Sequence, residues 1–401
     1  MSIDSFPVND IRQEFLALQK VENNHFVTYL DAASGTQLAK SVVDAMTTYM
    51  KNGVSHADGV HTSARETAAI VLRARDHVGQ FVGAKKENVV FGANMSTLAI
   101  MLSLYMSKCF PNEKKNIVIA KGNHEANVKP WETVAQVKAM DLRQIDPTDK
   151  GPEADWQTLI DEETALVALD FTSHITGLVN QIDVITSRAK EVGAYVVINA
   201  NHMLPYFAIN FNDMNVDVLL CSGHKVFGPH LGIAIISDYL MERFGDRKDT
   251  LEPGTVNYEA LVGMIEAVQF IAERAEGASL REEIEAAYQA ISMYEAYLIN
   301  YVKKTLSDFD FVKIHHGHAE HLHVPIIGFE IVGLDSKLAA HYLAQDYAIH
   351  VDYGFFHAES YVKELTNNEN GLIRMSLAPY NTMEEMERFI LAVTSLKEKI
   401  E

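Results

Sequence analysis

Hydrophobic positions along the chain follow two different periods. From Ser63 to about Gly83 apolar residues recur at helical spacing, and Ser63 with Glu66 fits an N-terminal capping box, so we predict a helix there. Short, continuous apolar runs follow, mostly separated by segments of helical length. Such a pattern is typical of an α/β fold with a largely parallel sheet covered on both faces. The runs are 89–91, 117–120, 166–169, 195–198, 216–221 and 232–236.

The pattern changes after Glu252. A long helical stretch, 280–306, leads to strands near Val312 and at 326–331, 349–351 and 372–376, with helices at 337–344 and 383–399. This arrangement predicts a small C-terminal α+β domain. We therefore divide the chain into 1–28, an N-terminal segment joining the small domain, 29–279, a large domain, and 280–401, a connector helix with the small domain.

Composition narrows the functional class. A length of 401 residues favours one large domain with a smaller one attached, and a net charge of -20 argues against nucleic acid as a partner. The two cysteines, Cys109 and Cys221, form no CxxC pair, which argues against a thiolate zinc site and favours a reducing compartment. Neither a signal peptide nor an apolar run of the ~20 residues that span a bilayer is evident. We expect a cytoplasmic protein with no membrane partner.

Polar clusters follow several of the predicted strands. In open parallel sheets the ligand lies beyond the carboxyl ends of the strands, so these clusters predict a shared site. They are 94–97, 124–131, 172–177, 199–202 and 222–225.

The segment VDVLLCSGHKVFGPHLGIAII carries the most information about chemistry. An apolar strand delivers Ser222, His224 and Lys225 to its carboxyl end, and glycines then turn the backbone into a second strand. A partly desolvated lysine there has a lowered pKa and can act as an amine nucleophile that forms an imine. A bare SxHK string more often marks a solvated loop lysine, but the surrounding strands and glycines favour the site.

A strand ending in SxHKxxGPxxG resembles the cofactor-lysine segment of class V aminotransferases and cysteine desulfurase-like enzymes, which are fold type I and depend on pyridoxal 5'-phosphate (PLP). Other motifs of this family occur in the same order along almost the whole chain. They are YLDAASG at 29–35, FGANMSTL at 91–98, HEANVKPW at 124–131, EPGTVN at 252–257 and RMSLAPYNT at 374–382.

The resemblance implies a large domain with a mostly parallel seven-stranded sheet, a small C-terminal α+β domain, and a site residue by residue. Lys225 would hold PLP as a Schiff base, His124 would stack on the ring, and Arg374 would grip the substrate α-carboxylate. The implied phosphate ligands are Met95 and Ser96 at a helix N-terminus, Ser222, His224, and Thr255 reaching into the neighbouring subunit, which implies a homodimer with shared sites.

Two positions depart from the family near the expected cofactor ring. Asn199 stands where the family places an aspartate that keeps the pyridine nitrogen protonated, so we predict slow or specialised chemistry and an absorption change on Asn199→Asp. His174 replaces an asparagine near the phenolic oxygen and either senses the Schiff base or is a more distant polar residue. His202 is the better candidate for the phenolic-oxygen contact.

The third departure concerns substrate class. Desulfurases carry a mobile-loop cysteine that receives the sulfur, and by spacing His357 stands at that position, as a candidate substrate-binding residue. Cys109 and Cys221 instead have the pattern of small buried residues. A standard persulfide-forming desulfurase is therefore not expected.

We predict a PLP-dependent enzyme that acts on a small amino acid, most consistent with a C–S lyase or an aminotransferase, with an amino-acid epimerase also open. The alternative from another class is a catalytically weak PLP-binding regulatory or carrier protein. Histidines at 315–323 would suit a metal site, but a solvated connector is favoured, and we expect no metal.

Overall fold

A computed structural model describes residues 6–148, 154–245, 251–315, 322–367 and 369–400. Its main feature is a seven-stranded sheet in the order β4, β10, β9, β8, β7, β5, β6. Neighbouring strands are parallel except at β10, which is antiparallel to β4 and β9. This confirms the predicted mostly parallel seven-stranded sheet. Its strands are β4 (Val89–Gly92), β5 (Asn116–Ala120), β6 (Asp141–Ile145), β7 (Thr164–Asp170), β8 (Tyr195–Asn199), β9 (Val218–Ser222) and β10 (Gly232–Ile236).

Strand β6 has no counterpart among the predicted apolar runs. Its sequence DLRQI is polar at three of five positions, and only Ile145 is buried. It lies at the edge of the sheet and pairs with β5 alone. An edge strand is not buried on both faces, so it lacks the apolar run that marks the central strands.

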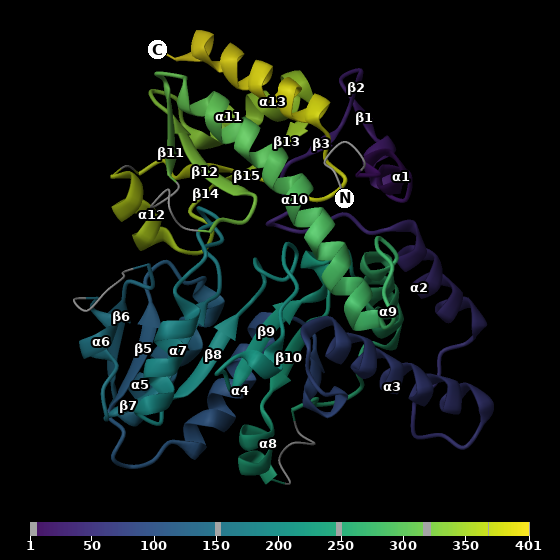
Figure 1. Ribbon diagram of the computed structural model, residues 1–401, viewed down its shortest axis with the longest axis vertical. Helices are drawn as coiled ribbons and strands as arrows, with labels where there is room; N and C mark the ends of the chain where they lie inside the picture. The colour runs from purple at the N-terminus through teal and green to yellow at the C-terminus, as the bar shows by residue number, and fades with distance from the viewer. Residues whose placement is uncertain (1–5, 149–153, 246–250, 316–321, 368, 401) are drawn as a thin grey trace.

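Helices cover both faces of the sheet, as Figure 1 shows. Alternate residues of one strand enter different cores: Leu219 and Cys221 face one cluster, and Val218 and Leu220 face the other. One face packs against α4 (Met95–Met106), α5 (Lys129–Lys138) and α8 (Asp238–Phe244); the other packs against α3 (Thr62–Val82), α7 (Ile182–Glu191) and α9 (Tyr258–Ala272). The remaining helices here are α2 (Lys40–Asn52) and α6 (Trp156–Leu159).

The start of α3 corrects a prediction. The N-cap residue is His61, whose Nδ1 accepts a hydrogen bond from the Ala64 amide at 3.3 Å. Ser63 lies inside the first turn, so the capping box predicted for Ser63 and Glu66 was wrong. The predicted end was right, because Gly83 adopts a left-handed conformation with φ 64° and closes the helix.

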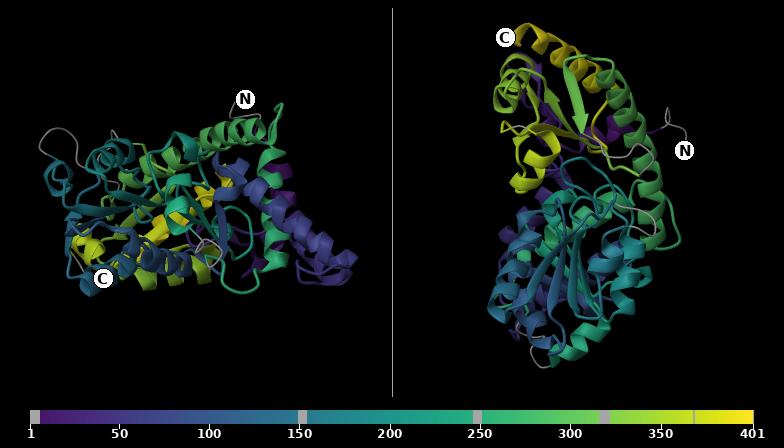
Figure 2. Two further views of the ribbon diagram at one scale, coloured as in Figure 1. Left: turned by 90° about the horizontal axis from the view of Figure 1, so that it is seen from below. Right: turned by 90° about the vertical axis from the view of Figure 1, so that its left-hand side faces the viewer.

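The C-terminal part is built around α10 (Leu280–Ser307) and an antiparallel sheet in the order β11, β12, β15, β14. The chain's beginning joins it, because β3 (Thr28–Tyr29) pairs with β13 (Ile349–His350). Figure 2 shows the two sheets in separate lobes, with α10 running along both. The exact division at 28 and 279 stays a prediction. The other elements are α1 (Val8–Gln13), β1 (Val21–Glu22), β2 (His25–Phe26), β11 (Val312–His315), β12 (Ile326–Ile331), α11 (Ser336–Tyr347), β14 (Asp352–Gly354), α12 (Glu359–Thr366), β15 (Leu372–Ser376) and α13 (Met383–Ser395).

Helix α10 carries an acid in the core between the lobes. Glu295 is 1% exposed, and neither of its carboxylate oxygens has a hydrogen-bond partner within the described part of the chain. Burial raises its pKa well above the usual value of 4.5. The folded state therefore holds this group as the neutral acid, since an unpaired buried charge is very costly.

We expect Glu295→Gln to stabilise the protein increasingly as pH rises. A carboxyl group whose pKa is raised on folding costs no stability below its pKa in the unfolded chain. Above about pH 4.5 the unfolded chain loses this proton while the folded protein keeps it, so the free energy of unfolding falls by up to ~1.4 kcal/mol per pH unit. Glutamine has a similar shape but does not ionise, so it adds no such pH dependence. Thermal unfolding at pH 5 and pH 8 should show a larger gain at pH 8, whereas exposed Glu285→Gln on the same helix should not. A gain independent of pH would contradict this prediction.

Candidate active site

Lys225 is positioned by the turn that joins β9 to β10. The strand ends at Ser222, and Gly223–Lys225 form a single 3-10 turn at the carboxyl edge of the sheet. Close packing requires the glycines: a Cβ on Gly223 would lie 2.6 Å from the Pro229 carbonyl oxygen, and one on Gly232 would lie 2.3 Å from the Asn94 carbonyl carbon. Neither position has room for a side chain, so the turn that carries Lys225 requires glycine at both.

The amine of Lys225 is held close to the N-terminal motif. Its Nζ donates to the carbonyl oxygens of Ala33 at 2.6 Å and Ser34 at 2.9 Å. Burial, followed by the charge of Arg374, lowers the pKa of Lys225 to about 7. Near neutral pH a large share of this amine is therefore unprotonated and can attack a carbonyl carbon.

A cavity of about 440 Å³ opens beside this amine. It brings together six of the residues predicted from sequence. The cavity is lined by Ala33, Ser34, His124, His174, His202, Lys225, Asp352, Tyr353, Phe356, His357 and Arg374. The other predicted residues, Met95, Ser96, Asn199, Ser222, His224 and Thr255, are not part of its lining.

The histidines of the cavity form a contiguous group. Ring centroids lie 5.2 Å apart for His124 and His174, 4.9 Å for His124 and His357, and 5.7 Å for His174 and His202. Burial, followed by the charge of His174, lowers the pKa of His124 to about 3, and burial lowers that of His202. Both rings are neutral at physiological pH, as a ring that stacks on a pyridine should be.

Asn199, the neutral residue at the end of β8, has a carboxyl group next to it. Asn199 donates from Nδ2 to Oδ1 of Asp170 at 3.0 Å, across the β7–β8 pair. Asp170 is 2% exposed and also accepts from Asn127 Nδ2 at 3.0 Å and from the His124 amide at 2.8 Å. His174 Nδ1 lies 3.6 Å from its Oδ2. A carboxyl group on β7 is thus hydrogen-bonded to the β8 position at which the resemblance implies an aspartate.

Sequence reasoning missed Asp170. The available signal was its place as the last residue of the buried run LVALD, which puts it in register with Asn199 if the two strands are parallel neighbours. Only the order of strands in the sheet shows that β7 and β8 are neighbours, and the pattern of apolar residues does not give this order.

Arg374 lies on β15, opposite Asp352 on β14. Its Nη2 donates to Asp352 Oδ2 and to Ser34 Oγ, each at 2.8 Å, and its Nη1 donates to the His174 carbonyl oxygen at 2.8 Å. The guanidinium also sits 4.5 Å from the centroid of the Phe356 ring. An ion pair and a place in the cavity thus coexist, and the carboxylate-binding role of Arg374 stays a prediction.

The segment that carries His357 is held by its backbone. Phe356 and His357 both have positive φ, 52° and 59°, a conformation that non-glycine residues seldom adopt. The Phe356 carbonyl oxygen lies 2.7 Å from His174 Nε2, and the His357 carbonyl oxygen accepts from the Glu125 amide at 3.0 Å. His174 therefore contacts this segment, a role that sequence analysis did not foresee, while its Nδ1 has no hydrogen-bond partner among the described residues.

The expected phosphate end lies at the start of α4. Asn94 caps this helix by accepting from the Thr97 amide at 2.9 Å, and Met95 and Ser96 form its first turn. Gly232 packs on Asn94 and is the register partner of Ser222, so the helix N-terminus lies by the β9 end. Helix N-terminal amides bind anions. An amine for an aldehyde, neutral rings for an aromatic face and this terminus for a phosphate together fit PLP.

Cysteines are absent from the lining of the cavity. Cys221 is buried in β9, where burial raises its pKa to about 12, and Cys109 ends a short turn after α4. Thr255 is exposed in the segment that follows 246–250, so its role at a neighbouring subunit stays a prediction.

The alternative of a metal site gains no support from the described residues. His315 in β11 lies 2.5 Å from Glu330 Oε1, and His316, His318 and His321 lie outside the described residues. In the described ranges no three His, Cys, Asp or Glu side chains group to hold a metal ion. Within the same ranges, no helix has the length and apolar character needed to cross a membrane.

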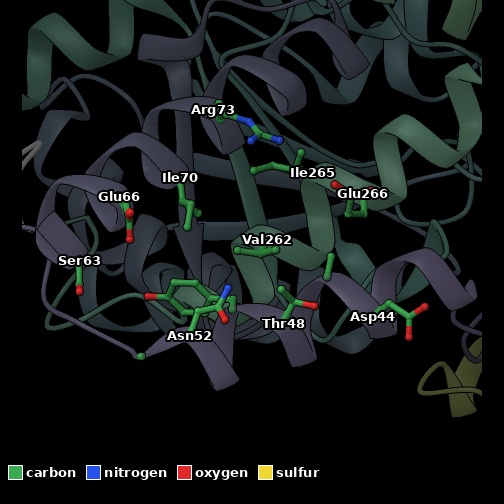
Figure 3. Close-up of a pocket in the computed structure, with 13 residues that line it drawn as sticks. Asp44, Thr48, Asn52, Ser63, Glu66, Ile70, Arg73, Val262, Ile265 and Glu266 are labelled. Atoms are coloured by element: carbon green, nitrogen blue, oxygen red, sulfur yellow. The ribbon is translucent and has the colours of Figure 1, made fainter.

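A second cavity of about 420 Å³ lies between α2, α3 and α9 (Figure 3). Its lining includes Asp44, Glu66, Arg73 and Glu266, but no lysine, histidine or cysteine. It shares no residue with the cavity at Lys225 and offers no amine nucleophile. Chemistry therefore favours the Lys225 cavity as the active site.

Comparison with known proteins places these features in a family. Residues 28–389 match the family model "Aminotransferase class-V". The chain is 25% identical over 419 residues to a cysteine desulfurase of Serratia proteamaculans, covering 98% of this chain and 99% of that protein. It is 33% identical over 236 residues to a probable cysteine desulfurase of Streptomyces coelicolor, covering 56% of each. The apo structure of a cysteine desulfurase from Thermococcus onnurineus NA1 aligns with a TM-score of 0.84 at 23% identity, over 98% of both chains.

Proposed function

The chain belongs to the class V aminotransferase family of PLP-dependent enzymes, and from this premise we propose that it acts on a small amino acid as a C–S lyase or an aminotransferase. The observation that carries the proposal is the Lys225 amine, with a pKa of about 7, at the wall of a cavity that also contains Arg374. An unprotonated amine and a cation for a carboxylate are the two groups such chemistry needs.

Each part of the site has a role in this proposal. Lys225 would hold PLP through its amine and would serve as the base for the proton at the substrate Cα. PLP, when bound, supplies an electron sink for the pair left at that carbon. His124 would pack on the ring, Arg374 would orient the substrate carboxylate, and the start of α4 with Ser222 and His224 would hold the phosphate.

A persulfide-forming reaction is disfavoured by the thiols. Persulfide transfer needs a thiolate that reaches the substrate sulfur, and Cys221 lies in a central strand with its pKa raised to about 12. His357, at the cavity, takes the place that the resemblance gives to the loop cysteine. This supports a lyase or an aminotransferase over a standard desulfurase.

Product analysis tests the proposal. The PLP-loaded protein is incubated with a panel of amino acids and cystine. Ammonia with a keto acid indicates elimination, a keto acid with pyridoxamine phosphate indicates transamination, and loss of optical activity alone indicates an epimerase. Turnover of none of them would overturn the proposal in favour of a PLP-binding protein. Sedimentation of the wild type and cofactor retention by Thr255→Ala test the proposed homodimer with shared sites.

A further inference from the structure

We propose that the site selects an amino acid whose side chain carries a second positive charge, and that Asp352 recognises that charge. The inference rests on the proposed function, in which Arg374 receives the α-carboxylate. It follows from how Asp352 and Arg374 share their hydrogen bonds.

Asp352 occupies the nitrogen of Arg374 that a substrate carboxylate requires. Its Oδ2 accepts from Arg374 Nη2 at 2.8 Å and from Ser34 Oγ at 2.7 Å. A guanidinium offers a carboxylate two edges for parallel hydrogen bonds, the end-on pair of Nη1 with Nη2 and the side-on pair of Nε with Nη2. Each edge uses one of the two Nη2 N–H groups, and these donate to Asp352 Oδ2 and to Ser34 Oγ. A two-bond grip on a substrate therefore displaces one of these two acceptors, and the incoming negative charge repels Asp352 and not the neutral Ser34.

The remaining donors of Arg374 indicate which edge is available. Nη1 already donates to the His174 carbonyl oxygen at 2.8 Å. Nε is buried and has no hydrogen-bond partner among the described residues. The side-on edge of Nε with Nη2 thus has one vacant donor, beside an Nη2 group that Asp352 and Ser34 share. An incoming carboxylate that takes both donors satisfies a buried N–H and brings a second negative charge against Asp352, which favours withdrawal of Asp352.

Asp352 is the partner that is free to move. Its side chain is 37% exposed, whereas that of Arg374 is 6% exposed. Once displaced, its carboxylate stays at the wall of the cavity without a cation partner. Asp31 does not line the cavity, but its charge interacts with that of Asp352. An acid left without its partner favours a cation in the space between it and the substrate.

A substrate with a second ammonium group keeps every charge paired. Its carboxylate pairs with Arg374 and its side-chain ammonium pairs with Asp352. The ion pair between Asp352 and Arg374 is thus replaced by two ion pairs between the protein and the substrate. The rings of Tyr353 and Phe356 line the same cavity and can face a cation. A substrate with an uncharged side chain leaves the displaced Asp352 with only water as a partner. An amine without a carboxylate does not compete with Asp352 for Arg374, so the Asp352–Arg374 ion pair stays formed.

Matched ligand pairs test the inference. L-Lysine and L-norleucine, or L-ornithine and L-norvaline, have equal carbon chains and differ in one amino group. Titration of the PLP-loaded protein, followed by absorption, should give a dissociation constant about tenfold lower for the diamino acid in at least one pair. Asp352→Asn should abolish that preference and Asp352→Glu should keep it. Asp346→Asn, an equal charge change on the exposed side of α11, is the control.

Two results would overturn the inference: equal affinities within both pairs, or tighter binding of 1,5-diaminopentane than of lysine. Failure of the proposed function looks different, because then the protein does not bind PLP through Lys225. In that case calorimetry of lysine and norleucine with the cofactor-free wild type and Asp352→Asn decides the matter, since both Asp352 and Arg374 are present without cofactor. The inference then requires that lysine binds the wild type more tightly than norleucine does, and that Asp352→Asn shows no such difference.

Discussion

Replacement of Lys225 by alanine is expected to abolish the Schiff base and to lower kcat by roughly 10²–10⁴-fold or more, the range associated with a lost acid–base group. The reason is positional. The β9–β10 turn places this amine against Ala33 and Ser34, and no other lysine lines the cavity. The purified variant given excess PLP should lack the visible absorption that borohydride removes from the wild type.

In the wild type, the rate of PLP uptake should follow the protonation of the Lys225 amine. Because burial and the charge of Arg374 lower the Lys225 pKa to about 7, the amine is mostly neutral above that pH and mostly an ammonium below it. The rate at which cofactor-free protein takes up PLP should therefore fall by about tenfold per unit below pH 7. Lys129→Ala, on a surface lysine paired with Glu125, is the matched control and should keep colour and rate. A coloured, borohydride-sensitive Lys225→Ala protein would refute the assignment.

The second large effect is expected at Asp170. Asp170→Asn leaves a single acceptor oxygen for the N–H groups of Asn127, Asn199 and His124, and it turns an amide N–H toward at least one of them. Because this position is 2% exposed, we expect a loss of roughly 2–4 kcal/mol in unfolding free energy. Asp346→Asn on the surface should change stability little.

A charge-swapped pair separates the electrostatic role of Asp170 from packing. If the carboxylate on β7 supplies the charge that the family carries on β8, Asp170→Asn alone should shift the absorption of the bound cofactor. The double variant Asp170→Asn with Asn199→Asp moves the charge back by one strand across a 3.0 Å contact and should restore both spectrum and stability. Asn199→Asp alone sets two carboxylates together, so one of them should stay protonated. A spectrum unaffected by all three variants would show that neither residue faces the ring.

These expectations change the view of catalytic strength taken from the sequence. Asn199 by itself suggested slow chemistry, because an amide cannot stabilise a protonated pyridine. Asp170 is hydrogen-bonded to Asn199, so a carboxyl group lies next to that position. The charge-swapped pair therefore also tests the alternative of a PLP-binding protein with little catalysis.

The sequence by itself determined the elements whose cause is local. The central strands are apolar because both faces are buried, and the turn around Lys225 needs Gly223 because the chain packs closely against it at Pro229, six residues further on. The family motifs then predicted the cavity residues Lys225, His124 and Arg374. Edge strand β6, with one buried residue in five, gave no comparable signal.

Only the tertiary structure decided which charges meet. Asp170 and Asn199 are 29 residues apart, and Asp352 and Arg374 are 22 apart, and both contacts depend on which strands are neighbours and in what register. Glu295 likewise fits an amphipathic helix in sequence, yet it is buried because α10 packs against both lobes. The period of hydrophobic residues along the chain predicts which residues are buried. The charged or polar partner of a buried residue depends on strand order and packing, which the linear pattern does not encode.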